Sequence, residues 1–357
     1  MMHDPRYTQL AEILVKQCVE TKPFENIWIR AISVDSLPLA REVYKQVVLL
    51  GANPLYDIHD DQVGAFFYKH ATAEQLRQKP DVMEYMANKA DKTITIVGEA
   101  NKRELAGADP KKMLERSKLI RPVKEIIMGK PWVLTYVPTP GMAQDAGMSY
   151  QDFTEFFFGA TLRDWKVVEK QMATWAKRLS KAKILHIKGN QTDLKLSVAG
   201  RKWISDDWKA NMPGGEVFTS PVADSAEGEL YFNFPLLRDG KMIRDIHLWF
   251  EKGRVVKATA SENEEFLKHI LETDEDSNRL GEVAFGGNPG ITEYMYNMLF
   301  DEKMAGTMHL ALGQGFAECG GETQSAIHMD IVKEMTSPGS EVLLDGEVFL
   351  REGVITV

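Results

Sequence analysis

The feature that most constrains the fold is a change of pattern near residue 184 of this 357-residue chain. Before that point, short apolar runs alternate with longer stretches in which apolar residues recur at helical spacing. After it, most apolar runs are short and are separated by Gly, Asn and Asp, which is typical of strands joined by tight turns. The chain is long enough for two hydrophobic cores. The sequence therefore predicts two domains, residues 1–184 and 185–357.

The first domain shows a rhythm of strands and helices. Strands are expected at 27–33, 64–70, 93–99 and 131–138. Helices are expected at 5–20, 38–50, 71–90 and 111–120, and a long helix is expected to end near Lys183. This alternation predicts an α/β domain with a mainly parallel sheet. Neither a GxGxxG nor a Walker pattern follows any of these strands, so a nucleotide site is not expected.

The second domain has the pattern of an α+β fold with a largely antiparallel sheet. Its strands are short, and helices interrupt them near 262–273 and 291–303. We expect this domain to be the catalytic, metal-binding one, because the candidate His and carboxylate residues described below lie in it.

Composition excludes several classes of protein. The net charge is −9, so the chain has no basic footprint for nucleic acid. No apolar run approaches the roughly 18 residues of a membrane helix, and the N-terminus lacks a secretory signal pattern. Two cysteines, Cys18 and Cys319, are too few for a disulfide framework. A cytoplasmic protein without a membrane or nucleic-acid partner is expected.

Residues 304–335 contain two short apolar runs, GTMHLALG and SAIHMDIV, joined by a glycine-rich loop. Side chains of a strand alternate between its two faces, so His328 and Asp330 project together on the face opposite to the apolar one. His309 occupies the polar face of the first run in the same way. A solvated strand face explains either run alone. Two such runs so close together make a metal site an equal alternative.

Two further carboxylates lie in glycine-bounded settings. Glu216 follows a Pro-Gly-Gly turn, and Glu282 lies in the similar sequence Gly-Glu-Val. Each alone is typical of a solvated strand end. Together with the His and Asp side chains above, they make three carboxylates and two imidazoles, which suits two divalent cations with a bridging carboxylate. The signatures GxSxG and HExxH are absent, so a serine nucleophile or a single-zinc helix site is not expected.

Four blocks, GGEVFTSPVADSAEG, LGEVAFGG, HLALG and SAIHMD, occur in this order. In this order they resemble the thermophilic aminopeptidase family, the aminopeptidase T-like dinuclear metallopeptidases. The segment YVPTPGMAQDAGMSYQDFTEFFFGATLRDW is similar to the one that leads into the family's interdomain helix. The resemblance covers Tyr136 to Val357, and the α/β first part fits the family's N-terminal domain.

The resemblance implies a metallo-aminopeptidase that hydrolyses the N-terminal peptide bond of small peptides with a water activated by two metal ions. It places the metal ligands at Glu216, Glu282, His309, His328 and Asp330. Glu282 would bridge both ions, and Glu216 would also steer the water, so both are candidate catalytic residues. Zinc, cobalt or manganese fits such ligands. The family also implies a homodimer whose N-terminal domains help to enclose a cavity.

One position departs from the family pattern. Phe316 stands where the family often has a tyrosine that stabilises the tetrahedral intermediate. Tyr294, Tyr296 and His247 are candidate replacements for the missing donor. Three alternatives stay open: the metals carry the charge unaided, the site serves another dinuclear hydrolase such as a dipeptidase or deacylase, or the chain is a metal-binding homologue with weak or lost peptidase activity. Asp224 and Glu227 are candidates for supporting contacts around the ligands.

Overall fold

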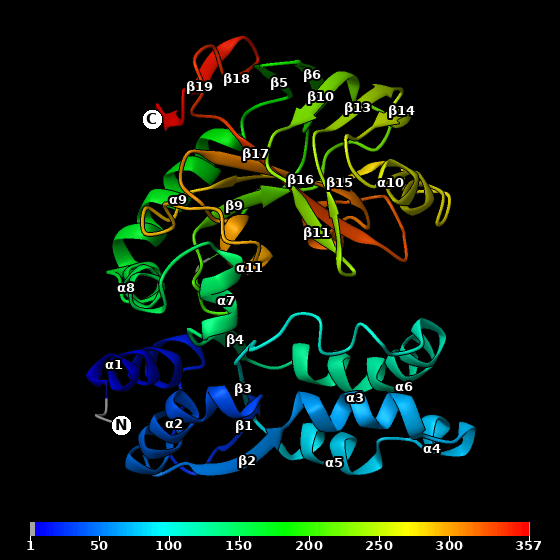
Figure 1. Ribbon diagram of the computed structural model, residues 1–357. Helices are drawn as coiled ribbons and strands as arrows, with labels where there is room; N and C mark the ends of the chain where they lie inside the picture. The colour runs from blue at the N-terminus through cyan, green and yellow to red at the C-terminus, as the bar shows by residue number, and fades with distance from the viewer. Residues whose placement is uncertain (1–3, 207, 357) are drawn as a thin grey trace. The chain divides into compact units, whose positions relative to one another are not determined.

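The computed structural model describes residues 4–206 and 208–356 and divides into two compact units (Figure 1). The first unit comprises Met1–Arg163 and Trp208–Pro213, and the second comprises Asp164–Asp207 and Gly214–Val357. Helix α9 (Trp165–Leu179) thus belongs to the second unit. Compactness alone does not show where independently folding domains end, so the limits 1–184 and 185–357 stay a prediction.

The first unit is built on a five-stranded sheet of order β2–β1–β3–β4–β8, in which every neighbouring pair is parallel. Its strands are β1 (Asn26–Ile32), β2 (Asn53–His59), β3 (Lys92–Val97), β4 (Trp132–Tyr136) and β8 (Asn211–Met212). Its helices are α1 (Pro5–Ile13), η1 (Leu14–Cys18), η2 (Val34–Ser36), α2 (Leu37–Leu49), α3 (Asp61–His70), α4 (Ala73–Arg77), α5 (Asp81–Lys89), α6 (Pro110–Met128), α7 (Pro140–Asp145) and α8 (Tyr150–Thr161). Strand β1 buries Ile27, Trp28 and Ile29 in succession, as a strand covered on both faces does.

The predicted strand at 64–70 is wrong, because those residues lie in α3. The second strand is instead β2, which pairs with β1 along its whole length. A short apolar run does not by itself distinguish a strand from a helix. The hydrogen-bonded pairing shows that β2, and not residues 64–70, is the neighbour of β1. The helix expected at 71–90 is two helices, α4 and α5, separated around Pro80. Helix α6 extends well beyond the predicted end at residue 120.

The second unit contains an eight-stranded and a five-stranded sheet, both antiparallel throughout, and the hairpin β11–β12. The order of the larger sheet is β14–β13–β10–β6–β5–β18–β19–β20, and that of the smaller is β17–β16–β15–β9–β7. The strands of the larger sheet are β5 (Ile184–Gly189), β6 (Thr192–Ser197), β10 (Glu227–Phe232), β13 (Ile246–Glu251), β14 (Arg254–Thr259), β18 (Glu341–Leu344), β19 (Glu347–Arg351) and β20 (Val354–Ile355). The remaining strands are β7 (Ile204–Asp206), β9 (Glu216–Thr219), β11 (Leu236–Arg238), β12 (Lys241–Ile243), β15 (Leu280–Gly286), β16 (Thr307–Gly313) and β17 (His328–Glu334).

The predicted fold class, an α/β part with a mainly parallel sheet followed by an α+β part with a largely antiparallel sheet, is confirmed. Besides α9, the helices of the second unit are α10 (Glu264–Leu271), α11 (Met298–Asp301) and η3 (Ala317–Cys319). The helix expected at 291–303 is therefore mostly wrong, since only four of its residues are α-helical. In the part of the chain that is described, no helix is long and apolar enough to cross a membrane.

One face of the five-stranded sheet packs against the eight-stranded sheet. The ring of Phe285, on β15, lies 5.0 Å from that of Phe349 on β19. From the same face of β17, the Nζ atom of Lys333 donates a hydrogen bond of 2.8 Å to the carbonyl oxygen of Tyr231 on β10. Successive side chains of a strand alternate in direction, so the opposite face of the five-stranded sheet holds the polar side chains.

Candidate metal centre

The five predicted ligands lie on that opposite face, on four adjacent strands. Strand β9 carries Glu216, β15 carries Glu282, β16 carries His309, and β17 carries His328 and Asp330. The register aligns them, because Glu282 pairs with Ala311 and Ala311 pairs with Asp330. All side chains that meet in this way point to the same side of the sheet.

Small residues fill the positions between the ligands on this face. Ala284 pairs with His309, Gly286 pairs with Glu216, and Gly313 pairs with His328. Their lack of bulk leaves room above the sheet for the longer polar side chains. A strand that alternates ligand with Ala or Gly is therefore suited to hold an ion close to the backbone.

The side-chain atoms of the five residues converge. The Nε2 atom of His328 lies 3.1 Å from Glu282 Oε2 and 3.2 Å from Asp330 Oδ1. The Nε2 atom of His309 lies 3.5 Å from Glu282 Oε1 and 3.4 Å from Glu216 Oε2. The structure thus brings all five predicted residues together, and their role as metal ligands stays a prediction.

Backbone carbonyls fix the orientation of both imidazoles. The Nδ1 atom of His309 is 3.1 Å from the carbonyl oxygen of Glu302, and that of His328 is 2.8 Å from the carbonyl oxygen of Gln314. A carbonyl can only accept, so each Nδ1 carries the proton and donates it. Each Nε2 therefore faces the carboxylates, which is the arrangement that orients a histidine for metal binding.

Three residues of the site did not emerge from the sequence: Asp206, Glu302 and Lys303. The Nζ atom of Lys303 lies 3.2 Å from Glu216 Oε1 and 3.8 Å from Asp206 Oδ2, and it also contacts Glu302 Oε1. Asp206 pairs with Glu216 across β7 and β9, so strand alternation places it on the same face. Glu302 and Lys303 lie in a turn after α11. A turn has no helical or strand period from which the directions of its side chains could be predicted.

The acidic and imidazole groups form two clusters that each have the ligand atoms for one ion. The first cluster is Glu282, His328 and Asp330. The second is Glu216, Glu302 and His309. In each cluster the candidate ligand atoms lie within 4.8 Å of one another. Glu282 also connects the clusters, because its Oε1 atom is near His309.

The charges of the site shift several pKa values. Burial raises the pKa of the Glu216 carboxyl to about 8, although the Lys303 ammonium opposes the shift. Burial lowers the pKa of an imidazole, but the surrounding carboxylates outweigh it and raise the pKa of His309 to about 10 and that of His328 to about 11. Both rings thus hold a second proton in the metal-free protein, and loading a divalent ion must release protons.

The remaining charged groups follow the same logic. Burial works against ionisation of Asp330, but its hydrogen bond from His328 prevails and lowers the pKa of that carboxyl to about 2. For Lys303, burial favours the neutral amine, yet Glu216, Glu302 and Asp206 raise its pKa above the ordinary value. Lys303 is therefore a permanent cation in the site.

The residues present fit divalent cations. The five carboxyl groups of Asp206, Glu216, Glu282, Glu302 and Asp330 face one lysine and two imidazoles. Buried carboxylates in such excess need cations to offset their desolvation. Glu216 Oε2 is buried and receives no hydrogen bond from any described residue, so it is available as a ligand. Mixed nitrogen and oxygen donors of this kind suit zinc, cobalt or manganese.

Phe316 lies beside the cluster, as its sequence position suggests. Its ring centroid is 5.1 Å from that of His328 and 5.2 Å from that of Phe218. Its backbone N–H donates to Ser220 Oγ at 2.8 Å, which fixes the loop. A phenyl ring at this position offers no hydrogen-bond donor.

The proposed replacement donors have other contacts. The hydroxyl of Tyr294 donates to the carbonyl oxygen of Pro235 at 2.6 Å, and its ring lies 5.2 Å from that of Tyr296. His247 lies on β13 of the other sheet, where its Nε2 is 3.0 Å from Glu229. These contacts do not place any of the three against the ligands.

Asp224 and Glu227 do not contact the ligands in the hydrogen bonds and ion pairs of the described residues. Asp224 forms an ion pair with Arg279, and Glu227 accepts a hydrogen bond of 2.8 Å from the backbone N–H of Lys252. Cys319 is a buried free thiol. The supporting role of Asp224 and Glu227 around the metal stays a prediction.

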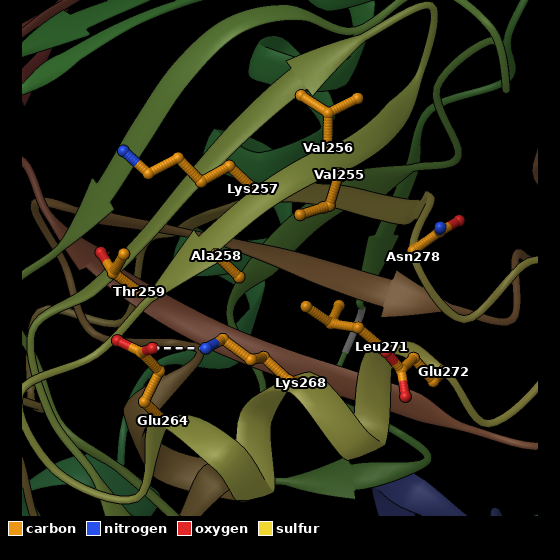
Figure 2. A pocket seen from close by; sticks show the side chains of 10 residues that line it. All are labelled: Val255, Val256, Lys257, Ala258, Thr259, Glu264, Lys268, Leu271, Glu272 and Asn278. Atoms are coloured by element: carbon orange, nitrogen blue, oxygen red, sulfur yellow. Dashed lines mark ion pairs between the residues drawn. The ribbon is translucent and has the colours of Figure 1, made fainter.

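A cavity of about 500 Å³ lies elsewhere, between β14 and α10 (Figure 2). Its polar lining includes Glu264 and Lys268, whose side chains form an ion pair of 2.6 Å across one side of it. None of the predicted ligands lines this cavity. The cavity is therefore separate from the predicted metal ligands.

Comparison with known proteins agrees with the sequence resemblance. The model of the family described as thermophilic metalloprotease (M29) matches residues 3–349. Aminopeptidase 2 of Geobacillus stearothermophilus is 27% identical over 86% of this chain and 83% of its own, and Aminopeptidase T of Thermus aquaticus is 31% identical over 52% of each. The structure of wild-type AmpT from Thermus thermophilus superposes with a TM-score of 0.85 over 99% of both chains at 24% identity, which supports the fold. The expectations of this family and of a peptide-bond hydrolase are confirmed, and the chain belongs to the thermophilic metalloprotease (M29) family.

Proposed function

We propose that this protein is an aminopeptidase that removes N-terminal residues from small peptides with the help of two divalent metal ions. The proposed ligands are Glu216, Glu282, His309, His328 and Asp330. The observation that carries the proposal is the placement of Glu282. Its two carboxylate oxygens face different imidazoles, Oε1 that of His309 and Oε2 that of His328. A carboxylate in this position is suited to bridge two ions.

The protein's own groups prepare the site before any substrate binds. The carbonyls of Glu302 and Gln314 hold the two imidazoles with Nε2 toward the carboxylates. Glu216 keeps Oε1 on Lys303 and directs Oε2 into the site, where it would orient the attacking water and accept its proton. Bound divalent ions would lower the pKa of that water and polarise the scissile carbonyl.

The choice of the N-terminal peptide bond is supported by the relatives. Five related proteins are named aminopeptidases, including those of Geobacillus, Bacillus and Thermus. The test compares amino-acid anilides with the same compounds blocked at the α-amino group. Cleavage of the free compounds alone supports an aminopeptidase, whereas cleavage of both supports a deacylase, and cleavage restricted to dipeptides supports a dipeptidase.

A second test addresses the bridge. Glu282→Gln is expected to lower kcat/KM at least about a hundredfold and to reduce the bound metal below two ions, since an amide is a poor bridging ligand. Glu42→Gln is the matched control, because Glu42 is equally buried but pairs with Lys45 in the first unit. A Glu282→Gln protein with two ions and normal turnover would show that the bridge is misassigned.

One observation favours a second candidate function, a metal-binding homologue with weak peptidase activity. The phenyl ring of Phe316 lies against His328 and has no hydroxyl to donate to a developing oxyanion. Loss of one such donor lowers turnover by about 10²–10³. Two bound ions combined with slow cleavage of every peptide tested would favour this alternative.

We also propose that the protein is a cytoplasmic homodimer. The dimer is an expectation from the family resemblance. The cytoplasmic location is an expectation from the composition. Light scattering of the purified protein measures the mass in solution. A mass near 40.3 kDa, that of one chain, would contradict the dimer.

A further inference from the structure

Lys303 is a buried lysine that lies among the carboxylates of the candidate metal centre. It is fully buried, and its ammonium group contacts carboxylate oxygens of Asp206, Glu216 and Glu302. Full burial prevents its contact with a substrate. Its positive charge therefore repels any metal ion that binds among these carboxylates.

The backbone around Lys303 is fixed over the sheet by close packing. A Cβ atom on Gly286 would overlap the carbonyl oxygen of Met304 and would lie 3.0 Å from that of Glu302. The same Glu302 carbonyl accepts the hydrogen bond of His309 Nδ1. The turn 302–304 therefore covers the site at the end of β15 and brings the Glu302 carboxylate into the cluster of Glu216 and His309.

The two clusters differ in which groups form ion pairs with their carboxylate oxygens. In the cluster of Glu216, Glu302 and His309, which we term position B, Lys303 occupies one oxygen of each carboxylate. In the cluster of Glu282, His328 and Asp330, which we term position A, the ion pairs of the carboxylates are with imidazoles. Position B therefore has a buried lysine against its carboxylates, whereas position A has none among the ion pairs of the described residues.

We propose that the two metal positions are unequal, that position A fills first, and that Glu302 is an additional ligand of position B, where Lys303 weakens the second ion. The proposal rests on the two-ion function proposed above and extends it. Coulomb repulsion between a buried ammonium and a nearby divalent ion is large even where water screens it. A further carboxylate near the ion partly offsets that repulsion, and Glu302 supplies it.

Titration of the metal-free full-length protein with Co²⁺ tests the proposal, because visible absorption and calorimetry follow binding without any activity measurement. The wild-type protein is expected to bind two ions in two steps whose affinities differ by at least about tenfold. A crystal with one equivalent of Co²⁺ should show its anomalous peak between Glu282, His328 and Asp330. A first peak between Glu216, Glu302 and His309 would overturn the proposal.

Two variants separate the roles of the neighbours. Lys303→Met is expected to tighten the second step at least about tenfold and to leave the first step within about threefold. Glu302→Gln is expected to weaken the second step alone by about tenfold or more. Lys333→Met is the matched control, because Lys333 is a buried lysine on the opposite face of the same sheet, and both steps should be unchanged.

Because Lys303→Met removes a partner of three buried carboxylates, circular dichroism must show that it folds. If it does not fold, Lys303→Arg and Glu302→Gln carry the test. Lys303→Arg keeps the charge and should keep two unequal steps. A second step that neither Lys303→Met nor Glu302→Gln alters would overturn the inference while leaving the two-ion function intact. Failure of the wild-type and Lys303→Met proteins alike to bind two ions would overturn both.

Discussion

Gly286 lies directly beneath Met304, so closely that any side chain on Gly286 would overlap the Met304 carbonyl oxygen. This contact holds the turn that presents the Glu302 carbonyl to His309 Nδ1. We predict that Gly286→Ala displaces the turn, lowers the free energy of unfolding by about 1–3 kcal/mol and weakens metal binding. Urea denaturation and metal analysis of the purified variant measure the two effects.

Gly159→Ala is the control for this prediction. Gly159 lies in helix α8, and no atom lies within 4 Å of an added Cβ there, so alanine should leave stability unchanged or raise it by about 0.5–1 kcal/mol. A Gly286→Ala protein as stable as wild type, with unchanged metal content, would show that the turn yields without disturbing His309.

The shared face of the five predicted ligands could be anticipated because strand alternation is a local rule. His328 and Asp330 share a face in any strand, and Glu216 and Glu282 each mark a Gly-Glu-Val run. The register that places Glu282 beside both histidines is not local. It depends on pairing between β15, β16 and β17, and only the resemblance to a family indicated it from sequence.

The contacts of Glu302 and Lys303 could not be predicted from strand alternation. Their segment was predicted as the end of a helix over 291–303, but the helix covers only Met298–Asp301 and a turn follows it. A turn has no period, so its side-chain directions are set by the tertiary contact with Gly286. Strand β2 was not predicted for a similar reason. It is defined by its pairing with β1 and not by an alternating sequence pattern.

Phe316→Tyr is predicted to raise kcat by about tenfold or more. The ring already lies 5.1 Å from that of His328, and a hydroxyl there could donate to the oxyanion, an interaction worth about 10²–10³ in rate. Steady-state kinetics on an amino-acid anilide measure it, and KM should change little. Phe218→Tyr adds a hydroxyl to the adjacent ring and should not raise turnover. Unchanged kinetics in Phe316→Tyr would mean that the hydroxyl is not limiting.

The pH dependence of stability should reveal Lys333. Burial lowers the pKa of its amine to about 8, although Glu334 opposes the shift. Between pH 8 and the ordinary value of 10.5, the unfolded chain binds more protons than the folded one, so the free energy of unfolding rises with pH in this window. The contribution is on the order of 3 kcal/mol, and below pH 8 the full penalty of the buried charge remains.

Lys333→Met lacks this titration. The difference in stability between the variant and wild type should therefore be most favourable to the variant near pH 7 and should shrink as pH rises to about 10. Denaturant unfolding at a series of pH values measures the difference, in which the titration of all other groups cancels. A difference that is constant across this range would show that Lys333 keeps an ordinary pKa.

Removal of divalent ions should destabilise the second unit. Five carboxyl groups surround Lys303 and the two histidines, and ions that bind only the folded protein add stability, about 4 kcal/mol when their concentration is a thousand times the dissociation constant. A chelator should therefore lower the unfolding temperature of the wild-type protein. It should lower that of Glu282→Gln much less, because this variant is expected to bind fewer ions. Calorimetry resolves both shifts, and equal shifts in the two proteins would mean that the chelated ions bind at another place in the chain.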